Sequence, residues 1–586
     1  MNRQDPRRGD LHVSHRLLHA VEIAAIALAL IFTGLLALDQ QFSWLGHRPG
    51  GQAFDLTSQP VFMALYAIGA LLALRFRLLG GALATFTAAA LLVFTSRQFR
   101  LPDGLVVFAG FLVPGLLWIT VGLFELRDEL FHRAEHERPR PLLRRRDVLG
   151  GIGVLALAGI GGVTAGRFLF DRVYGPTHPA STAKPITNSL TRWVWSGAVT
   201  ARSAVVTTRL QDDDLEEATL IVSSDAVADL DLPAEVSVAD EGFVRASLTD
   251  LEPDTEYHYM FRVAGEIDSN RVGRFRTMPE GPAGFSIAFG SCARTGSNGA
   301  VFDAIRSADP SLVIIDGDLH YADIAQNSNK AFREVLDYTL TRPAHAALWQ
   351  NYPVAYVWDD HDFGGQDESS NSRPAAMESY RQYVPHYPLA SRTSSVFQAF
   401  TVGRVRILIT DTRSSRQAAD DEDGALATML GKEQKEWLKA ELAGAGQAHE
   451  LTIWVNPVPW ISALSVEGDD WSAHSIERVE LADHIADNGL ASRLLMLSGD
   501  AHMTAIDDGT NSDYSTGRRA GFPVFHAGAL DRPGRVKGGP YSNGTFPNGG
   551  QFGLVEIEDD GTTMRVKLSG RDWRNEEFLN FEFTPQ

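Results

Sequence analysis

Four apolar runs in the second half of the chain each end in polar residues, and this recurring pattern constrains the fold more than any other feature. Each run has the length and apolar character of a buried strand. Because the carboxyl ends of parallel strands meet at one edge of a sheet, the polar residues should converge there. The pattern predicts a layered α/β domain over residues 281–586. The runs are Phe285–Gly290, Ser311–Ile315, Val354–Trp358 and Arg493–Leu497.

The residue types at the four strand ends are Asp, His, Tyr and Cys. These are donors that hard and borderline metal ions use. One Asp-Gly-Asp turn alone would be an ordinary loop, but four such ends in order indicate a metal site. Cys292, the single cysteine, cannot form an intramolecular disulfide. Taken alone, it reads as a small buried hydrophobic residue.

The charge is distributed unevenly along the chain. Residues 1–172 contain 18 arginines and 13 acidic residues, whereas the remainder contains 35 basic and 60 acidic residues. So acidic a domain argues against a nucleic-acid groove, which needs a basic stripe. It also repels phosphate esters unless bound cations reverse the local field.

The strand-end motifs resemble those of the calcineurin-like metallophosphoesterases and, more closely, the PhoD-type alkaline phosphatases. The resemblance extends roughly over Leu190–Gln586 and implies a four-layer metallophosphoesterase sandwich, two sheets flanked by helices. An Asp-Thr-Arg motif that follows a strand at 405–410 also fits. The similar motifs are Ser291-Cys292-Ala293, Asp318 with Tyr321, Trp358-Asp359-Asp360-His361-Asp362 and Gly499-Asp500-Ala501-His502.

The resemblance implies two metal ions. Thiolate and phenolate ligands suit a trivalent iron, whereas carboxylates suit calcium or another divalent ion. Because the resemblance groups Cys292 with Tyr321 and His502, it implies that Cys292 is a metal ligand and not a core residue. Asp316, Asp359 and Asp362 could instead orient a neighbouring ligand, and His320 fits a structural or solvent-facing role better. The implied iron ligands are Cys292, Asp318, Tyr321 and His502, and the implied divalent site shares Asp318 with Asp360 and Asp500.

Three further residues are candidates for contact with the substrate. His361 is expected to protonate the leaving alkoxide or polarise the phosphate, or else to support a ligand by a hydrogen bond. Arg413 could hold a phosphate oxygen, or form a structural ion pair with Asp411. Asn456, which follows a strand at 451–455, could contact the substrate.

Residues 1–146 contain four apolar segments that approach the length of a membrane-spanning helix. Arginines near the N-terminus, at the second turn and in a dense run over 127–146 place those loops in the cytoplasm by the positive-inside rule. The resemblance does not include these spans. We expect them at Leu17–Leu38, Val61–Leu74, Leu78–Phe94 and Leu105–Phe124.

Residues 147–189 contain a fifth apolar segment, Val148–Phe170, directly after Arg144-Arg145-Arg146-Asp147. It is either a fifth spanning helix or an internal segment that resembles a twin-arginine export signal. Both interpretations place the following residues on the periplasmic or extracellular side of the cytoplasmic membrane. The lipid bilayer, and the export machinery in the second case, are therefore the expected partners. The small residues at 180–183 could be a cleavage site, and 176–189 reads as a linker.

Residues 190–280 show short alternating runs broken by turn residues, which is typical of a β-sandwich. The segment Leu251–Tyr259 resembles the tyrosine corner of fibronectin type III domains, in which the hydroxyl of Tyr257 would bond to upstream backbone.

The expected function is hydrolysis of phosphate mono- or diesters by a water molecule activated by two metal ions. Two other classes stay open at this stage. One is a membrane sensor or binding protein with a non-catalytic phosphoesterase-like outer domain. The other is a structural envelope protein with a degenerate enzyme domain.

Overall fold

The computed structural model describes residues 177–586 except 216, 225–233, 325, 366–372, 392–394, 418–426 and 464–467. Within residues 1–176 it describes short stretches, of which the longest is helix α3 (Arg77–Ser96). Across the described residues, no helix is both long enough and apolar enough to cross a membrane. Apart from the third, which coincides with α3, the predicted spans and the export-like segment lie wholly or largely outside the described residues. The chain divides into two compact units after Gly175, and the second is the subject below.

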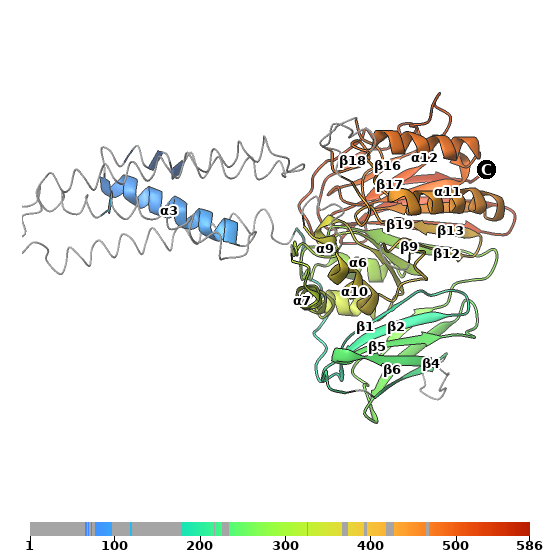
Figure 1. Cartoon of the computed structure of the whole chain (residues 1–586), viewed down its shortest axis with the longest axis horizontal. Helices are drawn as coiled ribbons and strands as arrows, with labels where there is room; N and C mark the ends of the chain where they lie inside the picture. Colours follow the sequence, from blue (N-terminus) through green and yellow to red (C-terminus); the bar gives the residue numbers. More distant parts are fainter. Residues whose placement is uncertain are drawn as a thin grey trace, which may run out of the picture. The chain divides into compact units, whose positions relative to one another are not determined.

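Two large sheets pack face to face in the second unit (Figure 1). The first runs β21-β20-β19-β9-β10-β11 and the second β12-β13-β14-β15-β17-β16-β18. β9, β10 and β11 are parallel neighbours, as are β13, β14, β15 and β17. The strands of the first sheet are β9 (Phe285–Gly290), β10 (Leu312–Asp316), β11 (Val354–Val357), β19 (Gln551–Asp559), β20 (Met564–Asp572) and β21 (Glu577–Phe583). Those of the second are β12 (Gln398–Val402), β13 (Val405–Ile409), β14 (Leu451–Asn456), β15 (Leu494–Ser498), β16 (Thr504–Asp507), β17 (Val524–Ala527) and β18 (Thr545–Phe546).

The central strands are buried along their whole length because both faces of each sheet are covered. Every residue of β10 is buried, as expected for a β-branched run in a parallel sheet. Between the sheets, the rings of Phe289 and Phe525 meet edge to face with centroids 4.9 Å apart. On the outer face of the second sheet, Leu438 and Leu481 pack with Trp454 in a separate core. This arrangement is the predicted four-layer α/β sandwich.

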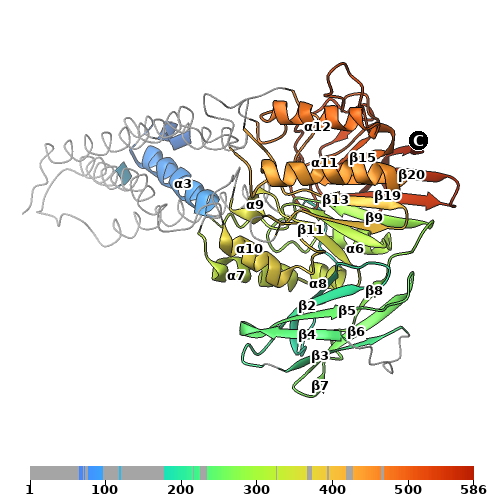
Figure 2. The same ribbon diagram turned by 45° about the vertical axis from the view of Figure 1, so that its right-hand side comes forward.

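Helices cover the outer faces of both sheets. α11 (Gly431–Ala448) and α12 (Ser475–Asp487) lie side by side over the second sheet (Figures 1 and 2). The helices on the side of the first sheet are α6 (Val301–Ser307), α7 (Asn329–Leu340), α8 (Pro343–Trp349) and α10 (Pro374–Tyr383). α7 begins where the side chain of Ser328 accepts a hydrogen bond from the amide of Ala331, which caps the helix. The remaining short helices are α9 (Asp360–Phe363) and the 3-10 turn η3 (Ala491–Arg493).

The predicted β-sandwich is present, and one of its sheets continues into the α/β domain. Strand β1 pairs in parallel with β11, so that β1-β2-β5-β4 extend the first sheet to ten strands. The tyrosine corner is confirmed, because the amide of Glu252 donates to the hydroxyl of Tyr257 over 2.9 Å. The predicted boundary near residue 280 therefore separates the domains along the chain but not across the sheet. The strands are β1 (Thr191–Gly197), β2 (Ala204–Leu210), β3 (Ala218–Ser223), β4 (Ala234–Ala239), β5 (Phe243–Leu248), β6 (Glu256–Val263), β7 (Glu266–Ile267) and β8 (Gly273–Arg276), with the 3-10 turn η1 (Asp240–Gly242) before β5.

The segment 177–182, predicted as part of a linker, is docked on the α/β domain. Ala180 forms an isolated bridge with Gly299, and the amide of Ser181 donates to the carbonyl of Asn298 over 2.7 Å. The carboxylate of Asp303 accepts from the Ser181 hydroxyl at 2.6 Å and from the Thr182 amide at 2.7 Å. These bonds satisfy backbone groups that a free linker would leave to water, which corrects the interpretation of this stretch as a linker.

Candidate metal centre

The predicted ligands lie just beyond the carboxyl ends of four strands. Cys292 follows β9 by two residues, Asp318 follows β10 by two, and Asp500 follows β15 by two. Asp360 is the first residue of α9, which begins shortly after β11. All but Asp500 are nearly or fully buried. The two parallel strand sets therefore deliver their polar ends to a shared edge, as the sequence predicts.

Cys292, Asp318 and Asp500 all have left-handed backbone conformations, with φ of 62°, 56° and 67°. Such a conformation is unfavourable for a residue with a Cβ, by roughly 1–3 kcal/mol. The same turn after each strand aims the side chain back across the edge. The preceding glycines allow the close approach: a Cβ on Gly317 would lie 2.5 Å from Cβ of Asp359, and one on Gly499 would lie 2.4 Å from the carbonyl oxygen of Asp316.

One half of the centre joins Cys292, Asp318, Tyr321 and His502. The Sγ of Cys292 lies 3.6 Å from Oδ2 of Asp318. The hydroxyl of Tyr321 lies 2.8 Å from the same oxygen and 2.9 Å from Nε2 of His502. The Nδ1 of His502 is 3.0 Å from the carbonyl of Pro533, which suits a proton on Nδ1 and a free lone pair on Nε2. The four side chains that the resemblance implies for one metal ion therefore lie together.

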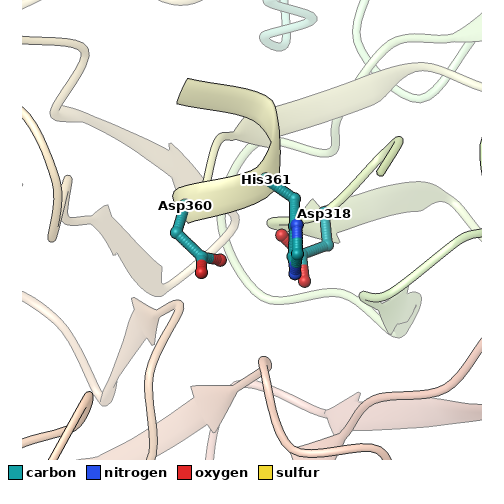
Figure 3. A group of neighbouring side chains, drawn as sticks. All are labelled: Asp318, Asp360 and His361. Atoms are coloured by element: carbon teal, nitrogen blue, oxygen red, sulfur yellow. The ribbon is translucent and has the colours of Figure 1, made fainter. Parts of the chain in front are cut away.

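The other half joins Asp318, Asp360 and His361, whose ligand atoms all lie within 4.8 Å of one another. Figure 3 shows the side chains of Asp360 and His361 extending from α9, with His361 beside Asp318. Asp318 therefore belongs to both halves, as a bridging ligand must. Asp500 reaches the first half through its carbonyl, which accepts from the Cys292 thiol at 3.4 Å, while its carboxylate accepts from Lys537.

The buried acidic groups fit a bound cation. Burial raises the pKa of Asp318 well above its usual range, and the neighbouring carboxylates of Asp360 and Asp359 raise it further. Burial likewise raises the pKa of the Cys292 thiol and of the Tyr321 phenol. Within the described part of the chain, Oδ1 of Asp318 and both carboxylate oxygens of Asp316 are buried without a hydrogen-bond partner. Metal ions would supply the missing positive charge and occupy such oxygens.

His361 is oriented by a carboxylate that the sequence reasoning missed. Its Nδ1 lies 2.5 Å from Oδ1 of Asp323, so Nδ1 donates to that carboxylate and Nε2 is not engaged by it. Burial alone lowers the pKa of His361, but Asp360, Asp323 and Asp318 together raise it well above its ordinary value. A protonated imidazole is the form that donates a proton to a leaving group.

The other two candidate catalytic residues have intramolecular partners. Arg413 is fully buried: its Nε donates to Asp359 at 2.5 Å, and its two terminal nitrogens donate to Asp469 at 2.8 and 3.1 Å. Its ion-pair partners are thus Asp359, Asp469 and, at 3.8 Å, Asp360, and not Asp411. The amide of Asn456 donates to the carbonyl of Val458 at 2.6 Å, and its oxygen accepts from Trp471 at 3.0 Å.

The acidic residues whose role the sequence left open support neighbouring groups. Asp362 accepts from the amides of Leu319 and His320 at 3.1 and 3.0 Å, which fixes the loop that carries Asp318. Asp359 pairs with Arg413. His320 is buried, with Nδ1 3.8 Å from Asp362, so its role is structural and not solvent-facing.

One loop, residues 531–537, contacts most of the candidate ligands. The amide of Asp531 donates to the carbonyl of Cys292 at 3.2 Å. The guanidinium of Arg532 lies 4.0 Å from the ring centroid of Tyr321, and Pro533 accepts from His502. Lys537 donates to Asp500. The charged run Asp-Arg-Pro-Gly-Arg-Val-Lys is the one feature of the sequence that could have pointed to this loop. Its partners are distant in sequence, so the run alone does not place it at the metal centre.

Two family models match the chain. The model of the PhoD-like phosphatase N-terminal domain matches residues 177–279, and that of the PhoD-like phosphatase matches residues 287–541. Together they include the sandwich, all nine candidate residues and the loop at 531–537. Residues 177–541 are therefore similar to the PhoD-like phosphatases. The match supports a phosphoric ester hydrolase and agrees with the resemblance of the strand-end motifs.

Individual proteins are similar over shorter stretches. Alkaline phosphatase D of Bacillus subtilis is 24% identical over 314 residues, which is 43% of this chain and 52% of that protein. An uncharacterized protein of Mycobacterium tuberculosis is 28% identical over 245 residues, 38% of this chain and 44% of that protein. The chain therefore spans about half the length of the curated relatives it matches. The solved structure of PhoD superposes with a TM-score of 0.57 over 70% of this chain and 92% of that chain, at 17% identity, and this likeness concerns the fold.

Proposed function

We propose that residues 177–586 form a metal-dependent phosphoesterase that hydrolyses phosphate mono- or diesters. The observation that carries the proposal is the position of Asp318. It touches Cys292 and Tyr321 on one side and groups with Asp360 and His361 on the other. A carboxylate shared in this way, in a family of phosphatases, suits a pair of cations that act on a phosphoryl group.

Two sets of side chains would hold the cations. Cys292, Asp318, Tyr321 and His502 suit trivalent iron, because thiolate, phenolate and imidazole stabilise it. Asp318, Asp360 and Asp500 suit calcium or another divalent ion. When bound, such a pair neutralises charge on the phosphoryl oxygens and lowers the pKa of a water molecule.

His361 supplies the proton in the proposed reaction. Asp323, which is not a candidate metal ligand, holds its Nδ1 and favours the protonated imidazole. The leaving alkoxide takes the proton from Nε2. Arg413 fixes the positions of Asp359 and Asp469 by hydrogen bonds, and its role in the site is therefore structural.

Hydrolysis of a panel of phosphate mono- and diesters by the purified full chain tests the proposal. Turnover should disappear with a chelator, return with added metal, and fall by at least about a hundredfold in Asp318→Ala. Asp560→Asn, on the exposed turn between β19 and β20, should retain wild-type turnover. Full activity of Asp318→Ala would refute the metal site. Tight phosphate binding without turnover of any ester would favour the sensor function instead.

We also propose that residues 177–586 lie outside the cytoplasm and that the chain is attached to the cytoplasmic membrane by its N-terminal apolar segments. Support comes from the run Arg144-Arg145-Arg146 directly before the apolar segment Val148–Phe170, together with the arginine-rich residues 127–146. Protease added to intact spheroplasts should digest a tag at the C-terminus. A protected tag would contradict this orientation, whether the fifth segment is a spanning helix or a twin-arginine-like signal.

A further inference from the structure

Lys537 places an ammonium group at the edge of the metal centre. Its Nζ donates to Oδ2 of Asp500 and lies 3.7 Å from Oδ2 of Asp469. The loop around it is fastened on both sides. The amide of Arg535 donates to the carbonyl of His502 at 2.7 Å, and the amide of Gly539 donates to the carbonyl of Ile461 at 2.7 Å. Backbone bonds on both flanks of the lysine hold its side chain at this position.

The neighbouring cations are already committed to other acids. Arg413 is fully buried and spans Asp359 and Asp469, and Arg416 lies 2.6 Å from Asp469. Asp469 is thus neutralised by arginines and needs little from Lys537. The side chain of Lys537 is 21% exposed, whereas that of Arg413 is 0% exposed. Lys537 is the better placed of the two to meet a molecule that arrives from solvent.

The partner of Lys537 is itself a candidate metal ligand. A cation bound to Asp500 offsets the negative charge of that carboxylate. The electrostatic attraction between Asp500 and the ammonium of Lys537 is then weaker. An ammonium also has three N–H donors, of which one carboxylate oxygen uses one. The remaining donors lie beside the place where a phosphoryl group would meet Asp500 and its cation.

We propose that Lys537 is a substrate-binding residue that donates to a non-bridging oxygen of the phosphoryl group. The proposal rests on the proposed function, and it assigns to Lys537 the phosphate-holding part that the sequence suggested for Arg413. An ammonium binds a phosphate as a point charge, so the contact serves both monoesters and diesters.

The test is a binding titration with the full chain saturated with a divalent ion, with inorganic phosphate as the probe. Lys537→Met should weaken phosphate binding by about tenfold or more, as expected for loss of one charge-assisted hydrogen bond. Lys537→Arg, which keeps the charge, should recover most of that affinity. The control Lys432→Met removes an exposed lysine of α11, whose side chain is 87% exposed, and should bind phosphate like the wild type.

A second titration, of the metal-free proteins with the divalent ion alone, separates substrate binding from support of the metal. Lys537→Met should bind the ion at least as tightly as the wild type, because Asp500 no longer has a competing partner. The proposal is overturned if phosphate affinity stays within about twofold of wild type. It is equally overturned if Lys537→Met loses divalent-ion affinity together with phosphate affinity, since Lys537 would then support the metal. Both titrations measure binding and not turnover. An absence of ester turnover would therefore refute the proposed function, whereas the role of Lys537 in phosphate binding would still be decided by the two affinities.

Discussion

Replacement of Arg413 by methionine separates a structural role from contact with the substrate. The guanidinium is fully buried and neutralises Asp359 at 2.5 Å and Asp469 at 2.8 Å. Loss of one partner of a buried ion pair typically lowers the free energy of unfolding by about 3–5 kcal/mol, because a charge is left uncompensated. Asp469 keeps Arg416 at 2.6 Å, whereas Asp359 has no other ion pair within the described residues. We therefore expect the lower end of that range, about 3 kcal/mol.

Urea-induced unfolding of the full chain, followed by tryptophan fluorescence, measures the change. The matched control is Arg276→Met, which removes an exposed arginine paired with the exposed Asp254 and should cost less than about 1 kcal/mol. If Arg413→Met stays within about 1 kcal/mol of the wild type while phosphate affinity falls, Arg413 faces the substrate and the structural reasoning is wrong.

Three smaller perturbations test other parts of the account. Asp323→Asn should lower kcat by about tenfold or more with little change in KM, because His361 loses the carboxylate that orients it and keeps it protonated; an unchanged kcat in steady-state assays would contradict that role. Asp303→Asn should cost about 1 kcal/mol at pH 7, since partly exposed hydrogen bonds to a charge are screened. Burial raises the pKa of Asp303, but the bonds from the docked segment and Arg306 outweigh it and hold that pKa below 3.8. The stabilisation is thus present above about pH 4 and is lost as the pH falls through the lowered pKa. Urea midpoints of wild type and variant should converge there, and a difference that persists below that pKa would contradict the assignment. Tyr257→Phe should cost about 1 kcal/mol or more, because the Glu252 amide loses its partner; an unchanged urea midpoint would show that this bond adds nothing.

The sequence predicted the features that depend on local pattern. Buried strands are short apolar runs, and the polar residues after β9, β10 and β11 meet because these parallel strands share an edge. The residues after β15 join them because the second sheet packs against the first. Asp318, Tyr321 and His502 lie together as the family resemblance implies. The tyrosine corner was also predictable, because the Tyr257 hydroxyl reaches back only five residues.

The features that the sequence reasoning missed depend on contacts between distant loops. Asp469 lies in a stretch with no motif, yet its carboxylate accepts hydrogen bonds from both terminal nitrogens of Arg413. Lys537 reaches Asp500 from a glycine-rich loop whose composition indicates only turns. The segment 177–182 has the composition of a linker, but it pairs with Gly299 and forms hydrogen bonds with Asp303. No local sequence pattern predicts these contacts. Such pairings follow from the packing of whole elements.

Metal content, measured by elemental analysis on the same sample used for ester hydrolysis, tests the central claim most directly. We predict stoichiometric metal in the active full chain, with turnover lost in proportion as the metal is removed. Iron bound by Tyr321 should in addition give a visible phenolate charge-transfer band that is absent from Tyr321→Phe. A metal-free preparation that hydrolyses phosphate esters at the full rate would contradict the account.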